Sequence, residues 1–348
     1  MRYFVSVLTV CLLLIITGCG TRLWTLPVQE NPAALAEHVR RPAQEYRHDH
    51  YPVTVETLNS RGEMQAQTFD RPPERVIAIW QNSIETLLAL GVGDRIIAGN
   101  GVPDAKYFRP EYQEAYRQIP YTGLQLLDLE TTMLLEPDMI VGWNSTFGPK
   151  VLRSTDFWQK RGTHTFIAAN SVGGRKDRTL ENELNDIRML GKIFDKSDRA
   201  EAIVAEMQGE IERAKAAAAT VQYKPRVLVI EFMGKEASVY NRRSLAGNMV
   251  EELQGELLVP DNVTIGLEQI VDLDPDAIFV VVIESHYGHE AQMIERVTKH
   301  PALQHLRCAR AGHVYALPLY AIYSSGVRTY DGLRIISGGM YPQVNGEQ

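Results

Sequence analysis

The chain contains one short pattern twice. The stretch LETTMLLEPDMIV (129–141) places Pro-Asp eight residues after its opening Leu-Glu, and LEQIVDLDPDAIFV (267–280) does the same. In each copy the proline disfavours helical geometry at the residue before it, and an apolar run follows. The pattern therefore predicts a short helix that is stopped by proline and leads into a strand, once in each half of the chain.

The segments around the two copies match in the same order. The β-branched runs PERVIAIW (73–80) and KPRVLVIEF (224–232) are each followed by a helical pattern, SIETLLALG and SLAGNMVEELQG. Ser83 is the expected N-cap of the first of these helices. Strands that alternate with helices form a parallel sheet with helices on both faces. The expected fold class is therefore α/β, with two Rossmann-like lobes at residues 51–179 and 221–345.

Residues 180–220, between the two lobes, carry a helical pattern. Leu180, Leu184, Ile187 and Leu190 form one apolar stripe, and a second stripe follows as far as the run of alanines at 216–219. We expect this segment to join the lobes as a long, stiff connecting helix rather than as a flexible hinge.

Residues 1–18 indicate a secretory signal. The apolar run after Arg2 is too short to span a bilayer, and small residues precede Cys19. The sequence ITGC (16–19) resembles the lipobox of bacterial lipoproteins, in which the cysteine is lipidated and becomes the first mature residue. We expect export, lipid anchoring at Cys19 facing the periplasm or the cell exterior, and a tether over residues 19–50. An ordinary signal peptide and a tilted anchor helix are the alternatives.

The charge and the cysteines exclude some classes. The net charge of −7, with both signs interspersed, argues against a nucleic-acid partner. Cys11 lies in the signal and Cys19 would carry lipid, so Cys308 has no cysteine with which to form an internal disulfide. We expect a monomer without a cofactor.

The order of the motifs resembles that of the substrate-binding proteins of bacterial ABC importers for ferric siderophores, haem and cobalamin. The resemblance covers about residues 50–343 and rests on PERVIAIWQNSIETLLALGVGDRIIAGNG, YTGLQLLDLETTMLLEPDMIVGW, RVLVIEFMGKEASVYNRRSLAGNMVEELQGE, LEQIVDLDPDAIFVV and HPALQHLRCARAGHVYALP. It implies two lobes joined by one long helix, with a ligand in the cleft between them. It also implies limited lobe closure and delivery of the ligand to an ABC permease with its ATPase.

Ligands of open parallel α/β sheets bind at the carboxyl ends of the strands. The residues after each predicted strand are therefore the ligand-binding candidates: Trp80, Gln81, Asn82, Asn100, Trp143, Asn144, Phe232, Met233, Tyr240, Arg242, Arg243, His286, Tyr287, Tyr320 and Tyr323. Aromatic rings suit a ring-bearing ligand, and the guanidinium group suits carboxylate or catecholate oxygens. The alternatives are core packing for the two tryptophans and a solvated loop for the two arginines.

A ferric siderophore offers both ring surface and anionic oxygens, so it is the first expectation for the ligand. Haem, with a Tyr or His axial ligand, and a corrinoid such as cobalamin are the alternatives. His286, His289 and Glu290 lie close together, but a short loop seldom orients three metal ligands, so no metal site is expected.

An enzyme is not expected. The sequence lacks the motifs GxSxG, GxxxxGK[ST] and HExxH. The alternative from another class is a metal-dependent lyase or hydrolase built on two α/β lobes.

The resemblance also implies one acidic residue on each lobe tip that pairs with permease arginines. In the second half Glu256, directly after a glycine, matches that position. In the first half Glu111 and Glu114 are candidates, and neither aligns cleanly.

Overall fold

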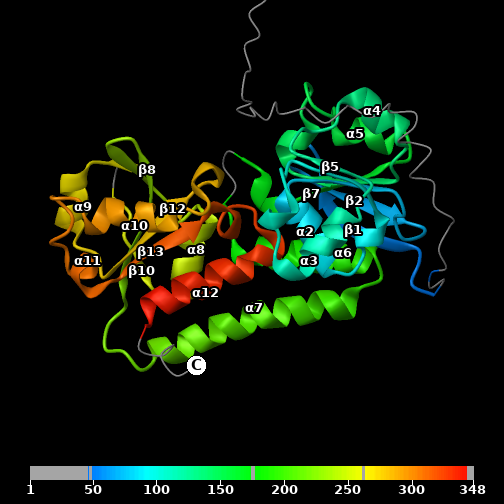
Figure 1. The fold of residues 1–348 in the computed structure, drawn as a ribbon. Coiled ribbons are helices and arrows are strands. Elements are labelled where there is room, and N and C mark those ends of the chain that lie inside the picture. The colour runs from blue at the N-terminus through cyan, green and yellow to red at the C-terminus, as the bar shows by residue number, and fades with distance from the viewer. Residues whose placement is uncertain (1–45, 47–48, 174–176, 261–262, 343–348) are drawn as a thin grey trace, which may run out of the picture. The chain divides into compact units, whose positions relative to one another are not determined.

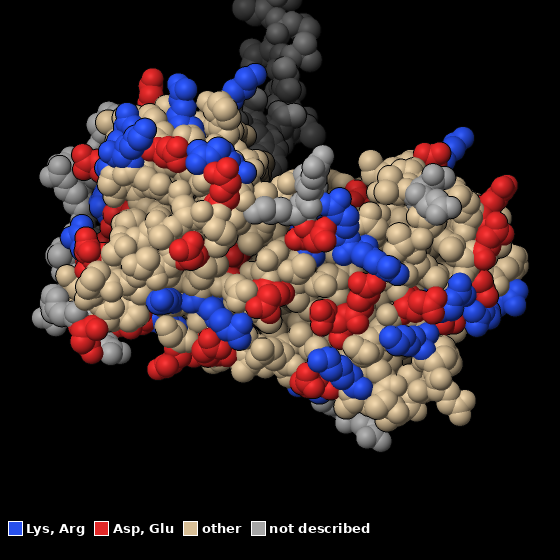
Figure 2. Space-filling model, turned by 180° about the vertical axis from the view of Figure 1, so that it is seen from behind, with Lys and Arg blue, Asp and Glu red and all other residues tan. Residues whose placement is uncertain are grey.

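The computed structural model describes residues 46, 49–173, 177–260 and 263–342, and Figure 1 shows their fold. The predictions for the signal at 1–18, for Cys19 and for most of the tether lie outside the described residues. Within the described part, no helix combines the length and the apolar character that a membrane crossing needs. Acidic and basic side chains lie interspersed over the face in Figure 2.

The first lobe contains a fully parallel sheet with the strand order β5-β4-β3-β6-β7. The strands are β3 (Val76–Ile79), β4 (Ile96–Asn100), β5 (Tyr121–Gly123), β6 (Met139–Gly142) and β7 (His164–Ile167), and the helices are α2 (Gln81–Ala89), α3 (Pro110–Arg117), α4 (Leu129–Leu134) and α5 (Thr155–Gln159). Side chains alternate along β3: Val76 and Ala78 pack in one core cluster, Ile77 and Ile79 in another. The helices cover both faces, as predicted.

A hairpin of β1 (Val53–Leu58) and β2 (Met64–Phe69) precedes this sheet and was not expected from the sequence. Gln67 joins it to the edge strand β7: its amide donates to the Thr165 carbonyl at 2.7 Å and accepts from the Thr165 amide N–H at 3.2 Å. The hairpin therefore occupies the edge of β7.

The second lobe repeats the plan around β8 (Arg226–Met233), which lies between β12 (Ala277–Val282) on one side and β9 (Glu236–Val239) with β10 (Glu256–Leu257) on the other. Its remaining elements are β11 (Thr264–Ile265), β13 (Val314–Pro318), α8 (Leu245–Glu252), α9 (Leu267–Leu273), α10 (Glu290–Thr298), α11 (Arg307–Ala311) and α12 (Thr329–Met340). Strands β10, β8, β12 and β13 pair in parallel, whereas β9 pairs antiparallel with β8, and β11 pairs antiparallel with β9. The second sheet is therefore mixed, whereas the sequence predicted a parallel one.

The repeated pattern folds as expected in both lobes. Helix α4 ends at Leu134 and helix α9 at Leu273, and in both copies the residue directly before the proline has a positive φ, 45° at Glu136 and 41° at Asp274. The aspartate after each proline then holds the first strand of its lobe. The Asp138 carboxylate accepts the backbone N–H groups of Glu74 and Arg75 at 2.8 and 2.9 Å. The Asp276 carboxylate accepts the N–H of Arg226 at 2.9 Å.

The connecting segment consists of two helices, α6 (Leu180–Ile193) and the longer α7 (Ser197–Ala218). The chain turns between them at Asp195, which has a φ of 51°. Helix α7 packs against α6 at one end and against α12 further along, and Figure 1 shows it beside the red α12. The fold class predicted from the sequence, two α/β lobes joined by a long helix, is confirmed.

One detail of the sequence prediction is wrong. Helix α2 begins at Gln81 with Trp80 as its N-cap, so Ser83 lies inside the helix. The backbone of Trp80 turns sharply at the strand end, and its N–H donates to the carbonyl of Asn100 at 2.8 Å. The helix therefore starts directly at the edge of the sheet, and this brings Gln81 and Asn82 to the site described below.

Candidate ligand-binding site

A cavity of about 610 Å³ lies where the two lobes meet. Its lining follows the carboxyl ends of strands in both lobes, as expected for this fold class. The first lobe contributes residues after β3, β4, β5 and β6, and the second contributes residues after β12 and β13. The lining residues are Trp80, Gln81, Asn82, Gly101, Val102, Pro103, Tyr107, Leu124, Trp143, Glu284, Ser285, Leu319, Tyr320, Tyr323, Ser324, Ser325 and Arg328. We call this cavity the cleft.

Aromatic rings form two connected series at the cleft, one of Trp80, Trp143 and Tyr323 and one of Tyr320, Tyr287 and Tyr107. The ring centroids of Trp80 and Trp143 are 5.2 Å apart, and those of Trp143 and Tyr323 are 5.4 Å apart across the two lobes. Tyr320 contacts Tyr287 at 5.4 Å, and Tyr287 contacts Tyr107 at 6.2 Å. Rings at these distances present a large apolar surface that suits a flat or ring-bearing ligand.

Trp80 has a backbone conformation that is unusual for a residue with a side chain. Its φ of 75° and ψ of 154° lie in a region that is essentially restricted to glycine. The ring lies so close to Gly101 that a Cβ at that glycine would come within 2.8 Å of it. The indole N–H of Trp80 has no hydrogen-bond partner among the described residues. Strain at a cavity wall is typical of a functional position.

The indole of Trp143 is held from its own lobe. Its Nε1–H donates to the side-chain oxygen of Asn82 at 2.7 Å. This bond fixes the ring at the end of β6 and engages the side-chain oxygen of Asn82, so the two predicted residues are joined in the cleft lining.

Arg328 is a buried cation in the cleft wall, and the sequence analysis did not single it out. Its guanidinium donates to Glu85 of α2 at 2.8 Å and to Asp331 of α12 at 2.9 Å, and it lies 4.7 Å from the Tyr320 ring centroid. Burial alone lowers the pKa of Arg328, but the two carboxylates outweigh burial and raise it. Arg109 pairs with the other oxygen of Asp331 at 2.7 Å. This four-residue network, which we call the interlobe network, ties α2 to α12.

A second buried carboxylate fixes the segment before Arg328. Glu183 of α6 accepts the backbone N–H groups of Ser325 and Gly326, the latter at 2.6 Å. Burial raises the pKa of Glu183, although these hydrogen bonds act in the opposite direction. Gly326 has a φ of 54° and lies so close to Thr86 that a Cβ would clash with it. The segment therefore packs directly on α2, and this positions Arg328.

The structure brings together only part of the predicted ligand-binding set within the described residues. Trp80, Gln81, Asn82, Trp143, Tyr320 and Tyr323 line the cleft. Asn100 lies beneath it, fully buried, and neither polar atom of its side chain has a partner in the described part of the chain. Tyr287 is not among the lining residues, but its ring packs edge to face against the ring of Tyr320.

Tyr240 and Arg243 lie in an adjacent hollow of about 360 Å³, which also has Tyr323 in its wall. The Tyr240 hydroxyl donates to Glu231 at 2.8 Å, and Arg243 pairs with Asp177 at 2.6 Å. Arg178, which the sequence analysis missed, donates to the Tyr323 hydroxyl at 2.8 Å and lies over its ring.

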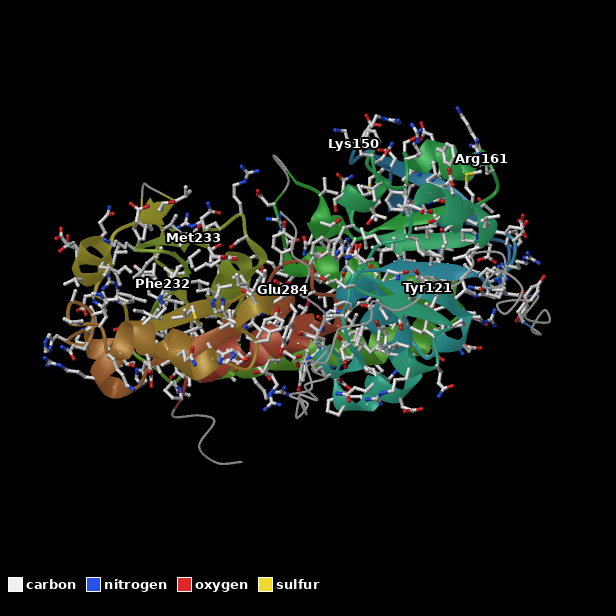
Figure 3. All side chains as sticks on the ribbon, turned by 45° about the horizontal axis from the view of Figure 1, so that its top comes forward. Tyr121, Lys150, Arg161, Phe232, Met233 and Glu284 are labelled. Atoms are coloured by element: carbon white, nitrogen blue, oxygen red, sulfur yellow. The ribbon has the colours of Figure 1, made fainter. Side chains whose placement is uncertain are left out.

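The other candidates lie outside both cavities. Arg242 is exposed and pairs with Glu251 at 2.9 Å, and His286 is exposed beside the cleft residues Glu284 and Ser285. Asn144 donates to the Ser60 carbonyl at 3.1 Å and so joins β6 to the first hairpin. The guanidinium of Arg296 covers the Phe232 ring at 4.1 Å. Figure 3 shows Phe232 and Met233 out on the second lobe and Glu284 near the junction of the lobes.

The acidic candidates for permease docking are exposed. Glu256 is 56% exposed at the start of β10, with Arg226 at 4.0 Å. Glu111 lies in the first turn of α3, and Glu114 on the same helix pairs with Arg117 at 3.3 Å. In the described part of the chain, no cluster of three or more His, Cys, Asp and Glu side chains is arranged to hold a metal ion.

Comparison with known proteins gives consistent results. The family model described as periplasmic binding protein matches residues 76–321. A periplasmic binding protein from Veillonella parvula has a similar structure, with a TM-score of 0.82 and 41% identity over 85% of this chain and 94% of that one. The petrobactin-binding protein YclQ of Bacillus subtilis is 23% identical over 73% of this chain and 77% of its own. A vitamin B12-binding protein of Vibrio parahaemolyticus is 24% identical over 42% of this chain and 48% of its own.

Proposed function

The chain belongs to the periplasmic binding protein family, and on that premise we propose that it captures a metal chelate in the aromatic cleft and delivers it to the permease of an ABC importer. The observation that carries the proposal is the cleft itself. It combines Trp80 and Trp143 from one lobe with Tyr320 and Tyr323 from the other, so a ligand there would contact both lobes at once.

The first candidate ligand is a ferric siderophore, and the petrobactin-binding relative supports it. A corrinoid is the second candidate, supported by the vitamin B12-binding relative and by the extended ring surface of the cleft. Haem is the third, with Tyr107, Tyr320 or Tyr323 as the available axial oxygen ligand.

Titration of the purified protein with ferric siderophores, a cobalt corrinoid and haem tests the proposal. Binding should quench tryptophan fluorescence and raise Tm, since a ligand that binds the native state stabilises it. The double variant Trp80→Phe/Trp143→Phe should lose most of the quenching, whereas Trp158→Phe, in the core of the first lobe, should keep it. If no chelate changes either Tm or fluorescence, the proposal is wrong. Chemical conversion of a bound chelate would instead indicate an enzyme.

Permease docking through Glu256, with Glu111 or Glu114 on the other lobe, is part of the same proposal. All three carboxylates are exposed, as charges at a rim that steers association should be. Glu256→Arg should reduce uptake in cells while the chelate affinity of the purified protein stays unchanged. Uptake at the wild-type rate would remove Glu256 from the docking surface.

Lipid anchoring at Cys19 completes the proposed function, and the support for it is the ITGC sequence. Cys19→Ser should move the protein from the membrane fraction to the soluble exported fraction. Retention of the variant at the membrane would contradict the anchor.

A further inference from the structure

The charges of the cleft wall are balanced within the protein. Arg328 is the cation in the lining, and its side chain is 10% exposed while that of its partner Glu85 is 0% exposed. The second partner, Asp331, also takes the charge of Arg109. The interlobe network thus contains two guanidiniums and two carboxylates, and it leaves no surplus positive charge for a ligand.

One further charged residue lines the cleft in the part of the chain that the structure describes. Glu284 lies at the end of β12 and is exposed, and no ion pair to its carboxylate is found in the described part of the chain. Lys106 lies beside Tyr107, with its ammonium 5.5 Å from the ring centroid. Lys106 is not a lining residue, so among the described residues of the lining Glu284 is the charged group without an ion pair, and the lining carries no surplus positive charge.

The described cations of the adjacent hollow do not line the cleft itself. Arg178 and Arg243 face Glu231 in its wall, and Asp177 pairs with Arg243. Arg178 uses its guanidinium on the Tyr323 hydroxyl and on the Asn170 carbonyl. Arg243 is thus paired with a carboxylate, and Arg178 is held by neutral oxygen acceptors.

A cleft of this kind is a poor environment for a polyanion. Moving an ion out of water costs several kcal/mol unless opposite charges and hydrogen bonds replace its hydration. An iron(III) tris-catecholate is a trianion, because each catecholate carries two negative charges, whereas a tris-hydroxamate is neutral. The aromatic walls can accept the ring or alkyl surface of either chelate, but the charges favour the neutral one.

Resting on the proposed function, we infer that the cleft selects metal chelates of zero or single positive charge and discriminates against polyanionic chelates. Glu284 is the specificity-determining residue at the rim. Neutral tris-hydroxamates, a hydroxamate chelate with a free ammonium group, and corrinoids share the required chemistry.

Affinities for a neutral tris-hydroxamate, an ammonium-bearing tris-hydroxamate, a trianionic tris-catecholate and a cobalt corrinoid test the inference. The wild-type protein should bind at least one neutral or cationic chelate about tenfold or more tightly than the tris-catecholate, and a preference for the tris-catecholate would overturn it. If none of the chelates binds, the proposed function itself fails. Equal binding of all charges leaves the proposed function intact and overturns the charge selection.

Variants at Glu284 test the assignment of the residue. Glu284→Lys should shift the preference towards the tris-catecholate by about tenfold, and Glu284→Gln should shift it less in the same direction. Glu206→Lys on α7 makes the same change in net charge at an exposed position outside the cleft and should leave the preference unchanged. A Glu284→Lys variant with the wild-type preference, or an equal shift in Glu206→Lys, would overturn the role of Glu284. Thermal melts check that each variant is folded.

Discussion

At the scale of single residues, the cleft depends on one strained backbone. Trp80 holds φ 75° and ψ 154° because three contacts fix it: its N–H bonds to Asn100, its carbonyl accepts from Ile84 in α2, and its ring packs on Gly101. A conformation of this type costs about 1–3 kcal/mol. The three contacts offset this cost, and they place the indole at the start of α2, where the cleft begins.

Replacement of Trp80 can separate strain from ligand contact. Trp80→Gly and Trp80→Ala both remove the ring and should weaken chelate binding by a similar factor. Glycine adopts the native φ without strain, so Trp80→Gly should unfold with a free energy about 1 kcal/mol higher than Trp80→Ala. Urea unfolding of the two variants measures the difference.

Trp143 offers a matched control for this comparison, because its φ is −86°. There the alanine variant should be the more stable of the pair, since glycine loses more conformational freedom on folding. If alanine is also preferred at position 80, Trp80 is not strained.

At the scale of elements, the repeated Pro-Asp pattern joins the end of a short helix to the start of the central strand in each lobe. In both lobes the residue before the proline has a positive φ, which the helix cannot continue through. The guanidinium of Arg75 then donates to the Glu136 carbonyl at 3.0 Å, and that of Arg226 donates to the Asp274 carbonyl at 3.0 Å. The acidic residues of the pattern therefore act in the scaffold, and the cleft residues follow at the far end of the strand.

Removal of the aspartate should destabilise its lobe. Asp138→Ala leaves two backbone N–H groups without their acceptor and should lower the free energy of unfolding by about 2 kcal/mol. Asp138→Asn keeps one acceptor oxygen and should cost less. Chelate affinity at low temperature should be retained in both variants. A loss below about 0.5 kcal/mol for Asp138→Ala would show that the carboxylate is not needed to hold the strand.

At the scale of the whole molecule, the lobes are tied by more than the connecting helices. The interlobe network joins Glu85 in the first lobe to Arg328 and Asp331 near the end of the chain, and Arg109 closes it from the first lobe. Buried pairs of this kind stabilise less than their geometry suggests, but loss of one partner leaves an uncompensated charge. The network should therefore restrict how far the lobes can move apart.

Breakage of the network should have a large effect. Arg328→Met leaves Glu85 buried without its counter-charge and should lower the free energy of unfolding by about 3–5 kcal/mol. Arg188→Met removes the exposed pair with Glu201 and should cost less than about 1 kcal/mol. The double variant Glu85→Gln/Arg328→Met should recover part of the loss. Chemical unfolding measures these losses. Equal losses in Arg328→Met and Arg188→Met would show that the network has no special role in stability.

The sequence by itself determined the elements and the edge of the sheet at which a ligand would bind. Strand and helix periodicity and the geometry around proline are local, so β3, α4, β6, α9 and β12 could be predicted, with small errors such as Ser83 as a cap. For the same reason Trp80 and Trp143 could be found at strand ends. The antiparallel edge of the second sheet could not, because short strands such as β11 pair through contacts that their own residues do not encode.

The tertiary structure alone decided which strand-end residues share the cleft and which charges remain available in it. Arg242 could be recognised as a loop arginine, but its partner Glu251 comes from the packing of α8 against that loop. Arg328 and Glu85 are 243 residues apart in the sequence and meet because the segment before α12 packs on α2. Charge neutralisation depends on such distant pairs, which the sequence alone does not reveal. The sequence therefore indicated arginines for an anionic ligand, whereas in the fold the arginine that lines the cleft is paired with carboxylates.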